Sequence, residues 1–140
     1  MSNPFSEIVV IDDNSIDQFI LEKMLTSVFK TLQITSYFNS KDFLKAVSKM
    51  DNPNTICFIF LDLYLPEMPT RDFLTEMESL EIETPIFIVS SAPKSEQIID
   101  SKLIAGYFCL SPLIDCSESA KQILNIKLGK YGKNKKIICA

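Results

Sequence analysis

The chain has 140 residues, with 46% hydrophobic residues and only 3 glycines and 7 prolines, a composition that excludes a globally disordered chain. It has no histidine, and its four cysteines lack C-x-x-C spacing, which argues against a zinc site and against Ser-His-Asp or Cys-His catalysis. No apolar stretch approaches the roughly 20 residues of a membrane-spanning helix, and the first residues do not resemble a signal peptide. We therefore expect a cytoplasmic protein with reduced cysteines that does not bind membranes.

The formal charge of −4 is unevenly distributed along the chain. Residues 1–120 hold all 18 acidic residues and 8 of the 14 basic ones, a balance of −10, whereas residues 121–140 hold six lysines and no acid. Such a basic end is either an interaction tail or the solvated end of a helix. We favour the helix end, because lysines commonly lie near helix C-termini, and we expect no binding to nucleic acid.

Short apolar runs alternate along the chain with amphipathic stretches. Five strands that alternate with five helices predict an α/β fold with a doubly wound parallel sheet in a single domain. In chain order the expected elements are strand 8–11, helix 15–29, strand 33–38, a helix reaching residue 50, strand 56–61, a helix after residue 69, strand 86–89, a weaker helix over 94–103, strand 107–110 and a helix over 118–128.

The spacing of apolar residues also predicts which helix faces meet the core. Asn14 or Ser15 can cap the first helix, and Asn39 and Ser40 mark a turn or cap before the second. The expected core-facing residues of the first helix are Ile16, Phe19, Ile20 and Met24, and those of the helix after residue 69 are Phe73, Leu74, Met77 and Leu80.

Three aspartates stand where apolar strands end: Asp12 and Asp13 after strand 8–11, and Asp62 after strand 56–61. In open α/β sheets the functional crevice lies at the carboxyl ends of the strands, so the three carboxylates converge if these strands are neighbours. Two carboxylates about 4 Å apart repel by roughly 4 kcal/mol at an effective dielectric constant near 20. Such a cluster needs a cation or a raised pKa, and its hard oxygen ligands suit Mg²⁺. A carboxylate beside that ion could accept a phosphoryl group.

These features together resemble the receiver domain of two-component response regulators, from about residue 8 to residue 128. The resemblance implies a flavodoxin-like fold with strand order 2-1-3-4-5. It also implies that residues 6–130 form the receiver domain and that residues 131–140 are a short basic tail with no output domain. The matching motifs are Asp12-Asp13 in VVIDDN, Asp62 and Pro66 in FIFLDLYLPEM, Ser90 in FIVSSA, and Phe108 with Pro112 around the last strand.

The resemblance assigns a role to each residue of the acidic cluster. It implies that Asp62 is the phosphoryl acceptor. It further implies that Asp12, Asp13 and Asp62 hold Mg²⁺ together with the backbone carbonyl of Tyr64. The loop after Asp62 departs from the family in having Pro69-Thr70 where a small or acidic residue followed by glycine is usual.

Three later residues complete the expected site. Ser90 resembles the hydroxyl residue that contacts the phosphoryl group, and Ser90 and Phe108 resemble the pair that switches conformation. Family members nearly always carry a lysine directly before the proline that follows the last strand, but here Ser111 precedes Pro112. Ser111 can donate a hydrogen bond but cannot form an ion pair with a phosphoryl oxygen.

Two functions follow from this pattern. The first is a stand-alone response regulator, a monomer or weak homodimer, that receives a phosphoryl group on Asp62 from a histidine kinase or phosphotransfer protein and signals through a downstream protein. Such a protein is a phosphoryl acceptor with at most slow self-dephosphorylation, not an enzyme. The second is a degenerate receiver that acts as an interaction module without phosphorylation, because Ser111 replaces the lysine.

Two other uses of a similar fold do not fit the residues. An aspartyl-phosphate phosphatase would carry a second aspartate two residues after the first, where this chain has Tyr64. A flavodoxin-like cofactor site would need a loop rich in hydroxyl residues and glycine after the first strand, and the acidic sequence DDNSID has the wrong charge for phosphate.

Overall fold

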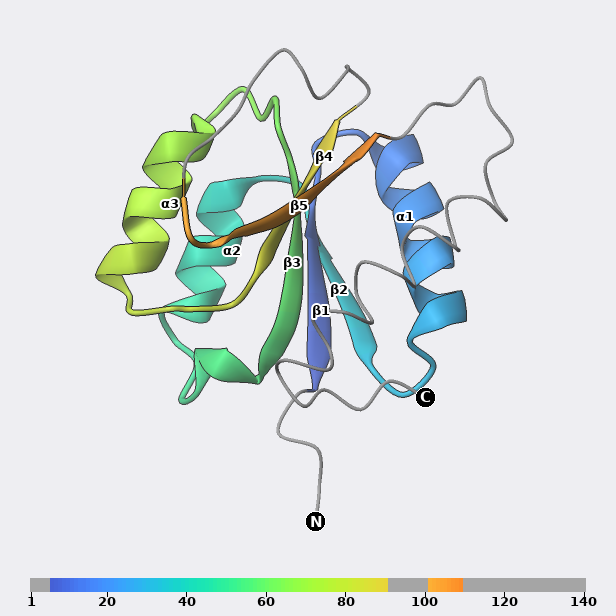
Figure 1. Cartoon of the computed structure of the whole chain (residues 1–140), viewed down its shortest axis with the longest axis horizontal. Helices are drawn as coiled ribbons and strands as arrows, with labels where there is room; N and C mark the ends of the chain where they lie inside the picture. The colour runs from blue at the N-terminus through green and yellow to red at the C-terminus, as the bar shows by residue number, and fades with distance from the viewer. Residues whose placement is uncertain (1–5, 91–100, 110–140) are drawn as a thin grey trace.

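The computed structural model describes residues 6–90 and 101–109, which form a parallel five-stranded sheet with helices on both faces (Figure 1). The strand order is β2-β1-β3-β4-β5, which confirms the predicted doubly wound sheet. The strands are β1 (Glu7–Ile11), β2 (Gln33–Tyr37), β3 (Ile56–Asp62), β4 (Ile86–Ser90) and β5 (Ile104–Cys109).

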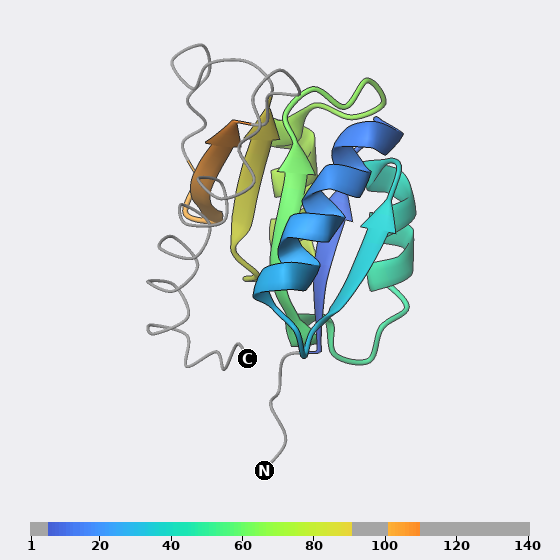
Figure 2. The same cartoon turned by 90° about the vertical axis from the view of Figure 1, so that its right-hand side faces the viewer.

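The described helices lie in two layers, one on each side of the sheet. Helix α1 (Ser15–Val28) covers one face, and α2 (Ser40–Val47) and α3 (Thr70–Ser79) cover the other (Figure 2), while the short 3₁₀ helix η1 (Pro53–Thr55) leads into β3. Side chains of β1 and β3 alternate between a core beneath α1 and a second core beneath α2 and α3. Burial on both faces explains why these strands are continuously apolar.

Aromatic side chains fill much of both cores. On the α1 side, the ring centroid of Phe87 lies 5.5 Å from that of Phe58 and 5.3 Å from that of Phe60. On the other side, the ring centroid of Phe43 in α2 lies 5.5 Å from that of Tyr37 and 5.9 Å from that of Phe73 in α3. Each fully buried phenylalanine contributes about 1.5–3 kcal/mol through removal of apolar surface from water, so the sheet is a rigid base for the loops at its edge.

Side-chain caps fix where two helices begin. The side chain of Asn14 accepts hydrogen bonds from the N–H groups of Ile16 and Asp17, at 2.9 and 3.0 Å. The side chain of Asn39 accepts from the N–H of Asp42 at 2.7 Å. Both asparagines therefore act as the caps that the sequence indicated.

The predicted buried face of α1 is wrong for Ile16 and Phe19 and confirmed for Met24, while Ile20 is partly buried. Ile16 and Phe19 are 66% and 58% exposed, whereas the buried residues of the helix are Gln18, Leu21, Met24 and Leu25. Two apolar stripes overlap in this sequence, and the four buried positions follow the spacing i, i+3, i+6 and i+7 of one helix face. In this rotation Leu21, Met24 and Leu25 pack into the core beneath α1, and the Gln18 side chain donates hydrogen bonds to two backbone carbonyls.

Several predicted boundaries also need correction. Strand β5 begins at Ile104 rather than at residue 107, and residues 101–103, expected at the end of a helix, include a turn. Ala105 and Gly106 have weak strand propensity, but pairing of this segment with β4 overrides it. Helix α2 ends at residue 47 rather than 50, and Leu80 lies beyond the end of α3 with 37% of its surface exposed.

The remaining predicted elements lie outside the described residues. These are most of helix 94–103, helix 118–128 and the basic tail 131–140. Within the described ranges, no helix is both long and apolar enough to cross a membrane.

Candidate functional site

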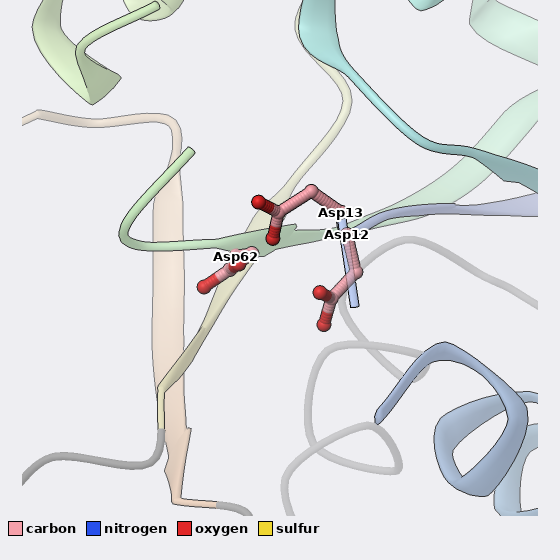
Figure 3. Close-up of side chains that lie close together, drawn as sticks. All are labelled: Asp12, Asp13 and Asp62. Carbon is pink, nitrogen blue, oxygen red and sulfur yellow. The ribbon is translucent and has the colours of Figure 1, made fainter. Parts of the chain in front are cut away.

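The register of β1 against β3 brings the three aspartates together. Ile11 pairs with Leu61, so the residues that follow them, Asp12 and Asp62, leave neighbouring strands at the same edge of the sheet. One carboxylate oxygen from each of Asp12, Asp13 and Asp62 lies within 4.8 Å of the other two (Figure 3). The predicted convergence of these residues is therefore confirmed.

The three carboxylates lie in unequal surroundings. Asp12 is buried, Asp62 is half-buried and Asp13 is exposed. Burial raises the pKa of Asp62 to about 7; a hydrogen bond from the Tyr64 N–H opposes this shift, and the negative charges of Asp12 and Asp13 add to it. Burial also raises the pKa of Asp12, against a hydrogen bond from the N–H of Asn14. The cluster thus carries negative charge where solvent screens it poorly.

Backbone and side-chain hydrogen bonds hold Asp12 in place. The N–H of Asn14 donates to Asp12 Oδ1 at 2.9 Å, and the N–H of Asp12 donates to the carbonyl of Tyr37 at 3.0 Å. Gln18, only 7% exposed, donates through Nε2 to the carbonyls of Asp12 and Tyr37, at 3.3 and 3.1 Å. The sequence prediction missed Gln18, although a polar residue on the same helix face as Leu21 and Leu25 is a signal for a buried anchor.

The loop from Asp62 to α3 is closed by hydrogen bonds of its own. The N–H of Leu63 donates to the carbonyl of Val89 at 3.0 Å, the N–H of Tyr64 donates to Asp62 Oδ1 at 3.2 Å, and Thr70 Oγ1 donates to the carbonyl of Leu63 at 3.2 Å. Glu81 is the only described residue with positive φ, so nothing in this loop requires glycine. Thr70 is accommodated and adds a hydrogen bond that glycine could not make.

The geometry of the cluster fits a small divalent cation. With Mg²⁺–oxygen distances of about 2.0–2.1 Å, adjacent ligand oxygens lie about 2.9 Å apart and opposite ones about 4.2 Å apart. The three carboxylate oxygens lie within 4.8 Å of one another. Small side-chain rotations, or water between an oxygen and the ion, would complete such a site. A cation there would favour the ionised form of Asp62 and offset the repulsion among the three carboxylates.

The other predicted site residues are only partly placed. The side chain of Tyr64 is half-exposed, and its backbone lies in the loop directly after β3. Ser90 ends β4, one residue after Val89, which pairs with both Asp62 and Phe108. The backbones of Ser90 and Phe108 thus belong to the strands beyond β3, but their side chains lie outside the description, as does Ser111 altogether.

The raised pKa of Asp62 predicts a pH dependence of stability in metal-free protein. An aspartate in the unfolded chain titrates near 3.9, so between about pH 4 and about pH 7 the folded state binds more protons, and the free energy of unfolding falls as pH rises. Asp62→Asn should remove much of this dependence. Urea unfolding with a chelator at about pH 5 and about pH 8 measures it. The control variant, Asp51→Asn at an exposed aspartate, should keep the wild-type dependence of stability on pH. If Asp62→Asn also kept that dependence, Asp62 would not be the group that causes it.

Comparison with known proteins identifies the fold. No family model and no curated protein matches the chain. Among solved structures, the signal receiver domain of an HD domain-containing protein from Pseudomonas fluorescens Pf-5 matches with a TM-score of 0.69 and 16% identity, covering 94% of this chain and 98% of that one. The response regulator TrrA from Thermotoga maritima, solved in complex with Mg²⁺-BeF, matches with a TM-score of 0.65 and 15% identity, covering 88% and 99%.

A third solved structure has the highest identity of these three. The phosphorylated cyanobacterial phytochrome response regulator RcpA matches with a TM-score of 0.67 and 20% identity, covering 90% of this chain and 96% of that one. Likeness at such low identity establishes the fold and agrees with the motifs in the sequence. The chain has the fold of the response regulator receiver domain, and these matches cover between 88% and 94% of it.

Proposed function

We propose that this protein is a response regulator receiver in which Asp62 accepts a phosphoryl group from a histidine kinase or a phosphotransfer protein. The observation that carries the proposal is the cluster of three carboxylates within 4.8 Å at the carboxyl ends of β1 and β3. The Mg²⁺-BeF complex of TrrA and the phosphorylated state of RcpA support it by analogy of fold. Signalling then proceeds through contact with a downstream protein.

The proposed reaction uses Asp62 as the nucleophile. One of its carboxylate oxygens forms a bond to phosphorus while the bond from phosphorus to the donor's imidazole nitrogen breaks, and the displaced imidazole takes up a proton. Asp62 must be ionised to attack, yet its pKa near 7 leaves it partly protonated in metal-free protein at neutral pH. Asp12 and Asp13 would therefore serve chiefly to hold Mg²⁺, which supplies positive charge for Asp62 and the phosphoryl oxygens.

The bonds around Asp12 support this division of roles. Gln18 and Asn14 fix its backbone and one carboxylate oxygen, so the ligand is positioned before a cation arrives. Asp13 is exposed and has more freedom to move towards an ion. One preorganised ligand and one adjustable ligand suit an ion that enters from solvent with several waters.

A second candidate function is the degenerate receiver, which keeps the fold and binds a partner without phosphorylation. The specific observation in its favour is Ser111, which leaves no lysine before Pro112. The two candidates differ in one chemical outcome, the formation of an acyl phosphate on Asp62.

That outcome can be measured as intact-protein mass after incubation with acetyl phosphate and Mg²⁺. We expect the wild type to gain one phosphoryl group, because the cluster supplies the nucleophile and would hold the cation, and we expect a chelator to prevent the gain. Asp62→Asn should show no gain, whereas Asp51→Asn, at an exposed loop aspartate, should behave like the wild type. A wild type that forms no adduct, even with rapid trapping, favours the degenerate receiver.

Replacement of Ser111 tests whether the missing cation limits switching. An ammonium group near the acceptor gains a charge-assisted contact only when a further anion arrives, so Ser111→Lys should strengthen the response to beryllofluoride with Mg²⁺. The readout is the change in amide chemical shifts around Ser90 and Phe108, expected to be small in the wild type and larger in Ser111→Lys. Ser48→Lys adds the same charge at an exposed position after α2 and should resemble the wild type.

A full rearrangement in the wild type would show that this receiver switches without the lysine. Equal, small responses in both proteins would show that the absent cation is not what limits switching.

A further inference from the structure

A hydrogen bond joins the loop that follows Asp62 to the N-terminus of α2. Glu67 lies in this loop, and its Oε1 accepts a hydrogen bond of 2.5 Å from the backbone N–H of Ser40, the first residue of α2. Ser40 is fully buried. The contact joins segments 27 residues apart and connects the loop after β3 to the layer formed by α2 and α3 (Figure 1).

The chemistry of this contact makes it strong but costly. A carboxylate that accepts from a helix N-terminal N–H gains from both its charge and the helix dipole. However, Glu67 Oε2 and Ser40 Oγ are both buried without a hydrogen-bond partner among the described residues. Buried polar atoms in this state carry a desolvation cost that two apolar residues would avoid.

The need to cap α2 does not explain why the fold keeps two buried polar atoms without hydrogen-bond partners. Asn39 already caps the helix, because its neutral side chain accepts a hydrogen bond from the N–H of Asp42. The additional contact of Glu67 fixes the loop rather than the helix, because the same loop carries Asp62 at one end and the backbone of Tyr64 two residues later. Thr70 closes the loop on its other side by donating to the carbonyl of Leu63.

We propose that Glu67 is a positioning residue for the cation site: it anchors the loop after β3 to the N-terminus of α2 and thereby holds Asp62 and the Tyr64 backbone in the arrangement that binds Mg²⁺. This inference rests on the proposed function, since it assumes that the acidic cluster binds the ion. Because Mg²⁺ binding and the anchor are thermodynamically linked, binding of Mg²⁺ at the acidic cluster should also change the environment of the Ser40 N–H.

The test compares Mg²⁺ titrations of the full chain, followed by calorimetry and by the amide shift of Ser40. Glu67→Ala removes the anchor, and its Kd for Mg²⁺ should rise about tenfold, as for other residues that orient metal ligands. Glu67→Gln keeps an acceptor oxygen and should stay within about twofold of the wild type. Glu76→Ala removes an exposed glutamate of α3 and should leave the Kd unchanged.

A second variant removes the same hydrogen bond from its other end. Ser40 is the first residue of α2, a position that favours proline, and Asn39 before it has the extended backbone (φ −152°, ψ 161°) that proline requires of its predecessor. Ser40→Pro therefore deletes the N–H donor while the helix start is retained. The Kd of Ser40→Pro for Mg²⁺ should rise as in Glu67→Ala. The proposal therefore stays testable even if Glu67→Ala fails to fold.

The outcomes separate the two levels of the proposal. Weak binding in Glu67→Ala and Ser40→Pro, with normal binding in Glu67→Gln, supports the anchor. Normal Mg²⁺ binding in Glu67→Ala despite a lower Tm would mean that Glu67 only stabilises the fold. Binding in Glu67→Gln as weak as in Glu67→Ala would mean that the negative charge of Glu67, and not its hydrogen bond to Ser40, supports Mg²⁺ binding. Either result overturns the inference but leaves the proposed function intact. A wild type without saturable Mg²⁺ binding overturns both.

Discussion

The parallel pairing of β1 with β3 is the constraint on which the rest of the site depends. It places Ile11 opposite Leu61 and so makes Asp12 and Asp62 neighbours at the edge of the sheet. Because both strands are buried on two faces, a shift of one residue would exchange the side chains of the two cores, and the register is therefore strongly fixed. The hydrophobic core thus determines the distance between the carboxylates, and the chemistry of the site follows from that distance.

Those carboxylates are kept close at a cost to the folded state. Burial raises the pKa of both Asp12 and Asp62, so the metal-free protein at neutral pH holds charge that the sheet edge does not favour. A stable fold can retain such a cluster because aromatic packing beneath α1, α2 and α3 fixes the strands independently. The apolar cores therefore support the cluster, and a divalent cation would supply the positive charge that the cluster needs.

The parts of the structure that depend on local sequence could be predicted. Continuous apolar runs gave β1 and β3, asparagines marked the starts of α1 and α2, and the aspartates after the strands indicated the site. Features decided by tertiary contact could not. The rotation of α1 follows from which of its residues pack on the sheet and from the contacts of Gln18 with the carbonyls of Asp12 and Tyr37, and it leaves Ile16 and Phe19 exposed. The contact of Glu67 with Ser40 joins distant segments and has no local signal.

The most direct test of the central claim is to locate the bound ion with Mn²⁺ in place of Mg²⁺, because both ions accept the same oxygen ligands and Mn²⁺ broadens the NMR signals of nearby nuclei. Amide signals of residues 12–14 and 62–64 should lose intensity first and should recover when Mg²⁺ is added in excess. Gln33 and Ile56, at the opposite end of the sheet, should keep their signals. Broadening centred on other acids, such as Glu81 and Glu83, or broadening that Mg²⁺ does not reverse, would contradict the claim.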